Sequence, residues 1–61
     1  MPFVEVKLWE GRSAEEKNKL IAAITKAFED VLNTNPEHLT IVITDVPKEN
    51  WGSRGKSAVY W

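Results

Sequence analysis

The fold is set by residues 3–32, which read FVEVKLWEGRSAEEKNKLIAAITKAFEDVL. Residues 3–9 alternate between aliphatic and charged side chains, and this period of two predicts a strand. Phe3 and Trp9 lie at its two ends, on the charged face, so that face is partly apolar as well. The turn that follows, residues 10–12, contains the glycine that lets the chain change direction.

A helix follows this turn. Ser13 and Glu16 have the spacing of a capping box, in which each side chain binds a free backbone N–H of the other. Apolar residues then recur at spacings of three and four, which indicates one apolar stripe. Asn33 tolerates a left-handed cap and Pro36 cannot continue a helix, so we expect the helix to run from about Ala14 to Leu32.

A second strand is predicted at residues 39–46 (LTIVITDV), which are apolar on both faces over their middle. Since a helix joins the two strands, they should form a parallel pair with a right-handed crossover. Residues 58–61 (AVYW) are expected to form a short terminal strand after the glycines of residues 50–55, so that the chain ends in a short strand or hairpin. The expected fold is therefore α/β (α+β), a single β-α-β domain over residues 1–61.

The chain is too short to bury a large core alone, because small domains usually need disulfides, a metal or partner subunits. It has 61 residues, no cysteine and one histidine, so disulfides, thiolate metal sites and a clustered metal site are not expected. One helix also covers only one face of a two-stranded sheet. We therefore expect a homo-oligomer; the alternative is an unstable fragment of a larger protein, which the complete capping box disfavours.

The net charge of −1 argues against nucleic-acid or anionic-membrane partners, both of which need clustered Lys and Arg. No apolar run reaches the ~18 residues of a membrane span. The start of the chain lacks the basic region and apolar stretch of a signal peptide. We expect a cytoplasmic protein whose partners are small molecules and copies of itself.

Pro2 is the most distinctive candidate for chemistry, since His38 lies in a turn without an obvious partner and no phosphate-binding glycine loop is present. If Met1 is removed, Pro2 becomes a terminal secondary amine. Burial beside cations disfavours the charged form of such an amine, which suits a general base near neutral pH. The opposing interpretation is that Pro2 merely begins a strand, where proline is tolerated. From Pro2 alone, that second interpretation is the stronger.

Five short segments change this balance. They are Met1–Val4, Leu8–Ser13, Glu15–Lys17, Ile41–Val46 and Lys48–Gly52. Together, from Pro2 through Gly55, the chain resembles the 4-oxalocrotonate tautomerase family. The resemblance implies a β-α-β subunit assembled as a hexamer, without cofactor or metal, and a place in aromatic degradation.

The same resemblance implies how the residues act. The terminal proline, Pro2, takes a proton from a dienol such as 2-hydroxymuconate and returns it at a distant carbon. Arg12 matches the arginine that binds a substrate carboxylate, and Trp51 matches the aromatic residue that walls the site. Trp9 stands at an apolar pocket position. The enol or keto acid is thus the expected substrate, and isomerisation the expected reaction.

One position departs from the family pattern. Thr40 stands where many members have a second arginine that polarises the substrate carbonyl, and a neutral hydroxyl cannot supply that charge. Arg54 is a candidate to replace it. Relatives that hydrate halogenated acids use an acidic residue where this chain has Ser53, which disfavours that activity. The alternative function is a catalytically weak or inactive binding or structural oligomer of the same fold.

Overall fold

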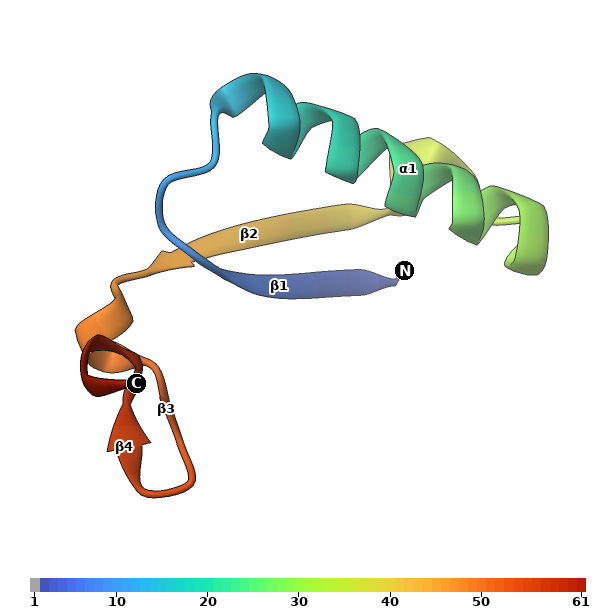
Figure 1. The fold of residues 1–61 in the computed structure, drawn as a ribbon. Coiled ribbons are helices and arrows are strands. Elements are labelled where there is room, and N and C mark those ends of the chain that lie inside the picture. The colour runs from blue at the N-terminus through green and yellow to red at the C-terminus, as the bar shows by residue number, and fades with distance from the viewer. Residues whose placement is uncertain (1) are drawn as a thin grey trace.

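The chain folds as a β-α-β unit followed by a small hairpin (Figure 1). A computed structural model describes residues 2–61. The strands and helix are β1 (Phe3–Trp9), α1 (Ala14–Leu32), β2 (Thr40–Val46), β3 (Gly52–Ser53) and β4 (Lys56–Ser57). Three short 3-10 helices connect or follow them: η1 (Pro36–His38), η2 (Lys48–Asn50) and η3 (Ala58–Tyr60). The predicted α/β fold is confirmed.

Strands β1 and β2 pair in parallel, with Phe3 opposite Thr40 at one end and Trp9 opposite Val46 at the other. Burial alternates along β1, and α1 lies over one face of the ribbon (Figure 1). An ion pair of 2.7 Å between Lys17 Nζ on α1 and Asp45 Oδ2 on β2 joins the two layers. The half-buried aliphatic residues on the helix side are Val4, Val6, Leu8, Ile41 and Ile43.

Both predicted ends of α1 are confirmed. The Ser13 hydroxyl accepts from the Glu16 N–H, the Glu16 carboxylate accepts from the Ser13 N–H, and both contacts measure 3.1 Å. Asn33 closes the helix in the left-handed conformation, with φ of 55°. The apolar stripe is not packed along its whole length, because Val31 and Leu32 remain 79% and 64% exposed. Among residues 2–61, no helix is long and apolar enough to cross a membrane.

The end of the chain differs in part from expectation. Strand β2 begins at Thr40 rather than residue 39, because the Leu39 N–H closes η1 by donating to the Pro36 carbonyl. The predicted hairpin is present, as β3 and β4. Residues 58–60, however, are the 3-10 helix η3 and not a strand, since the Ser57 hydroxyl caps it by accepting the Val59 N–H.

The apolar surface is only partly covered within one chain. None of the residues 2–61 is fully buried. The radius of gyration is 14.5 Å, whereas a compact domain of this length has about 10–11 Å. On the ribbon face opposite α1, Phe3 is 64% exposed, Val42 39% and Trp9 37%.

Candidate active site

The head of the β1–β2 ribbon brings Pro2 and Thr40 together. The Thr40 N–H donates to the Pro2 carbonyl at 3.3 Å, directly before the first residue pair of the ladder. Pro2 is half-buried, and Thr40 is exposed. Met1, which we expect to be removed, lies outside the described residues. The backbone therefore holds the proline at a defined place beside the residue that departs from the family pattern.

A cluster of three tryptophans lies at the far end of the ribbon. Trp9, the last residue of β1, has its ring centroid 6.0 Å from that of Trp51, at an interplanar angle of 77°. Its centroid lies 5.8 Å from that of Trp61, at 54°. Lys48 Nζ sits 4.8 Å from the Trp9 centroid, in cation–π range. We call Trp9, Trp51 and Trp61 the tryptophan cluster.

Trp61 was not among the predicted site residues. Its indole N–H donates to the Lys56 carbonyl at 3.2 Å, which holds the ring against the hairpin. The contact between Trp9 and Trp61 joins the end of the first strand to the end of the chain. No local spacing in the sequence signals such a contact, although the sequence does show two adjacent aromatic residues, Tyr60 and Trp61.

Arg12 lies between the ribbon and the helix, after Gly11, whose φ of 117° favours glycine. Arg12 Nη1 is 3.4 Å from Glu16 Oε2, and the two side chains are 64% and 55% exposed. The Ser13 backbone N–H, with Arg12 as a second cause, holds the pKa of Glu16 below its ordinary value. An exposed pair of this kind is weak, so the Arg12 guanidinium can exchange Glu16 for a ligand carboxylate.

The predicted site residues divide between the two ends of the β1–β2 ribbon. Pro2 and Trp9 are seven residues apart along an extended segment, which spans about 23 Å at ~3.3 Å per residue. Trp51 and Arg12 lie beyond the Trp9 end, where the Glu10 N–H closes the ladder on the Val46 carbonyl. Within a single chain, Pro2 therefore lies next to Thr40 but far from Arg12 and from the tryptophan cluster.

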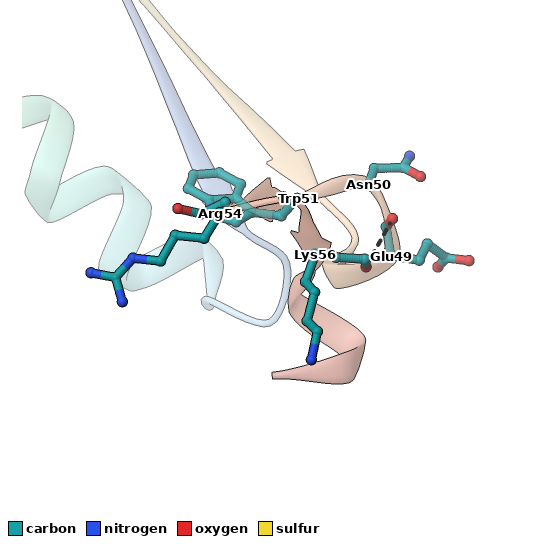
Figure 2. A pocket seen from close by; sticks show the side chains of 9 residues that line it. Glu49, Asn50, Trp51, Arg54 and Lys56 are labelled. Carbon is teal, nitrogen blue, oxygen red and sulfur yellow. Dashed lines mark hydrogen bonds between the residues drawn. The ribbon is translucent and has the colours of Figure 1, made fainter.

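Two open pockets flank the hairpin. One, of about 510 Å³, is lined by residues 49–57 (Figure 2). The other, of about 360 Å³, is lined by Ser53, Arg54, Lys56 and Trp61. Arg54 therefore lies in the hairpin that follows the far end of the β1–β2 ribbon, whereas Thr40, where it was a candidate to supply the missing charge, lies at the head of the ribbon. Within residues 2–61, no group of three or more His, Cys, Asp or Glu side chains is arranged to hold a metal ion.

Comparison with known proteins identifies the class to which this fold and these residues belong. Residues 2–59 match the family model described as "Tautomerase enzyme". The chain is 41% identical over 58 residues to a 2-hydroxymuconate tautomerase from Comamonas testosteroni, covering 95% of this chain and 92% of the relative. This chain belongs to the tautomerase family and is an enzyme of the isomerase class.

Solved structures agree with this assignment. A 4-oxalocrotonate tautomerase isozyme structure from Methylibium petroleiphilum superposes with a TM-score of 0.92 at 32% identity, covering 97% of this chain and 92% of the other. A heterohexamer 4-oxalocrotonate tautomerase from Chloroflexus aurantiacus gives 0.89 at 27% identity, covering 97% and 95%. The family resemblance predicted from the sequence is confirmed.

Proposed function

We propose that this enzyme moves a proton within an enol or dienol carboxylate of the 2-hydroxymuconate type, with Pro2 as general base and then general acid. The observation that carries the proposal is the position of Pro2 at the head of β1, where the Thr40 N–H binds its carbonyl at 3.3 Å. The proline ring fixes its own backbone angle and its nitrogen takes no part in the ladder. The relative at 41% identity, named a 2-hydroxymuconate tautomerase, supports the substrate class.

The proposed reaction needs one mobile proton. The Pro2 amine, exposed by removal of Met1, takes the proton from the enol hydroxyl and leaves a conjugated enolate. The electron pair moves along the double bonds, and the protonated amine returns the proton to a distant carbon. The product is the keto isomer, with the same atoms and the same oxidation state. A positioned group of this kind contributes typically 10²–10⁴-fold to the rate.

The other residues bind and enclose the substrate in this proposal. The Arg12 guanidinium presents a planar fork that matches a carboxylate. Trp9 and Trp51 form an apolar wall that excludes water and strengthens the electrostatic contacts. Since Arg12 and both indoles lie about 23 Å or more along the ribbon from Pro2, one small substrate contacts all four only when they come from different copies.

We therefore propose a homo-oligomer, with a hexamer as the expected form. The absence of a fully buried residue among residues 2–61, the exposed Phe3 and Val42, and the radius of gyration of 14.5 Å all support association. One structural neighbour is itself named a heterohexamer. Light scattering at micromolar concentration should give a multiple of the 7.0 kDa subunit mass; a monomer mass would refute the assembly.

Thr40 favours a second candidate, an oligomer that has kept the fold and binds ligands with little turnover. Its side chain is neutral, and its backbone pairs with Phe3 and donates its N–H to the Pro2 carbonyl. Without a cation at that place, an enolate next to Pro2 lacks a strong stabilising group. A turnover assay with 2-hydroxymuconate and the enol of phenylpyruvate distinguishes the two candidates.

The test of the proline mechanism compares three preparations from one batch: protein trimmed of Met1, protein that retains Met1, and trimmed Pro2→Ala. With Met1 in place the Pro2 nitrogen is an amide, whose lone pair is delocalised and cannot accept a proton. We expect the trimmed protein to be fastest, Pro2→Ala slower, and the Met1-retained form near background, as checked by intact mass and rate. Equal rates for the trimmed and Met1-retained forms would exclude Pro2 as the base.

A further inference from the structure

The smaller hairpin pocket combines two cations with an aromatic wall. Arg54 and Lys56 line it together with Ser53 and Trp61, around a volume of about 360 Å³. The Trp61 ring is held in place by its N–H contact to the Lys56 carbonyl and by its packing on Trp9. We call the space lined by these four residues the hairpin pocket.

Positive charge without a local counter-charge is concentrated in this part of the chain. The sequence has eight Lys and Arg residues, and five of them form ion pairs within residues 2–61. The remaining three are Lys48, Arg54 and Lys56. Residues 47–61 contain these three cations and one acidic residue, Glu49, so the segment has a net charge of +2 within a chain of −1.

The Arg54 backbone adds a second observation. Arg54 and Gly55 form the two-residue turn between β3 and β4, with φ of 57° and 80°. Two positive φ angles define a type I′ turn, whose first position favours Asn, Asp or Gly. An arginine in this conformation is unfavourable for the local backbone. A functional role of the Arg54 side chain, such as ligand binding, would explain why it is there. In Figure 2 the Arg54 and Lys56 side chains extend away from the Glu49 carboxylate.

We propose that the hairpin pocket binds a carboxylate carried on a flat, unsaturated carbon chain. Arg54 and Lys56 donate charge-assisted hydrogen bonds to the acid group, and the Trp61 face contacts the conjugated chain. The ligand is then the second acid group of a dicarboxylate enol, an identification that rests on the proposed tautomerase function. The binding itself does not depend on turnover. Such a pocket would supply the cation that Thr40 lacks, from the hairpin of another copy.

The experiment measures equilibrium binding by titration calorimetry with two unreactive probes, the dicarboxylate muconate and the monocarboxylate sorbate. The test variant is Arg54→Asn/Lys56→Gln, because Asn suits the left-handed turn and preserves the hairpin. The matched control is Lys19→Gln/Lys26→Gln, which removes the same charge from exposed helix positions that are ion-paired with Glu15 and Asp30. Circular dichroism and light scattering confirm that both variants fold and assemble alike.

We expect the test variant to bind muconate at least about tenfold more weakly than the wild type, with a smaller loss for sorbate, since a charge-assisted contact is lost. The control should bind muconate within about twofold of the wild type, as exposed charges act weakly. Trp61→Ala should weaken both probes, and Trp61→Phe should restore part of the affinity. Equal losses in the two double variants, or no muconate binding by the wild type, would overturn the inference.

A separate arm distinguishes this inference from the proposed function. In Pro2→Ala, muconate binding should still depend on Arg54 and Lys56, because these two cations, and not the proline amine, hold the acid group. If the enzyme fails to turn over any enol while muconate binding still depends on Arg54 and Lys56, the proline mechanism fails and the pocket stands. If turnover is normal and muconate binding does not change when Arg54 and Lys56 are replaced, the proline mechanism stands and the proposed carboxylate site in the hairpin pocket is refuted.

Discussion

The two ends of the β1–β2 ribbon differ in both composition and the way they are held. Among residues 2–61, neither Pro2 nor Thr40 at the head takes part in an ion pair, and the backbone ladder positions both. The far end carries the tryptophan cluster and every lysine and arginine that forms no ion pair within residues 2–61. The candidate base therefore lies apart from the candidate binding groups. In our proposal, the end of one copy meets the head of another.

The largest effect is expected at the far end, from Arg12→Ala. Losing a charge-assisted contact to carboxylate should cost roughly 1.5–3 kcal/mol, which raises KM about 10–150-fold for an enol that bears that carboxylate. An enol without it should be affected less. Steady-state kinetics on both substrates, with Arg12→Lys as the conservative control, make the comparison. Equal effects on the two substrates would mean that Arg12 does not bind the carboxylate.

Trp9→Ala tests whether the far end depends on the tryptophan cluster. Trp9 packs on both Trp51 and Trp61, and each aromatic pair contributes about 0.5–1.5 kcal/mol beyond its buried area. We expect the free energy of unfolding to fall by at least about 1–3 kcal/mol, the sum of the two pair contributions, measured by urea denaturation at fixed protein concentration. Trp61→Ala, which removes one pair only, should cost less. If the two variants are equally stable, Trp9 is not the centre of the cluster.

Thr40→Arg tests the head of the ribbon. The substitution keeps the N–H that binds the Pro2 carbonyl and adds a cation beside the proposed base. If charge limits the rate, ketonisation of a 2-hydroxymuconate-type substrate should rise, by up to about tenfold for a donor that is not ideally placed. The double variant Thr40→Arg/Arg54→Asn shows whether the gain from the new arginine depends on Arg54. No gain from Thr40→Arg in an assembled variant would indicate that Arg54, from another copy, already fills this role.

The smallest effect is expected on stability, from a change at Glu16. This residue caps α1 and is not part of the β1–β2 ribbon. The Ser13 N–H, and secondarily Arg12, lower the pKa of Glu16. The stabilisation from its charge is therefore present above the unfolded pKa and is lost as the pH falls through the lower folded value. Glu16→Gln should flatten the acid side of the stability curve from urea titrations. Glu15→Gln, an exposed neighbour without the capping contact, should leave the curve nearly unchanged; the same change in both would remove the cap as the cause.

Local patterns predicted most of the fold. The alternation in β1, the capping box and the left-handed Asn33 gave the bounds of the first strand and the helix, because each depends on neighbouring residues. The start of β2 and the end of the chain were less predictable. In both places a short 3-10 helix competes with the strand for one backbone donor, the Leu39 N–H or the Val59 N–H.

The candidate site was predictable only in pieces. The parallel pairing of the strands was expected, and it places Thr40 beside Pro2. The packing of Trp61 on Trp9 joins residues from the two halves of the chain, so no periodicity reveals it. The separation of Pro2 from Arg12 became visible only with the folded chain. How two copies bring these residues together depends on an interface that a single chain does not contain.

The central claim, that one active site draws residues from different copies, is tested most directly by mixing subunits. Pro2→Ala and Arg12→Ala proteins are unfolded together, refolded in equal amounts and assayed at substrate concentrations well below KM. Each variant alone should be slow. Random assembly should restore about a quarter of the wild-type rate, the fraction of shared sites that receive both intact residues. A mixture that shows only the average of the two variants, in oligomers proven to be mixed by native mass, would contradict the claim.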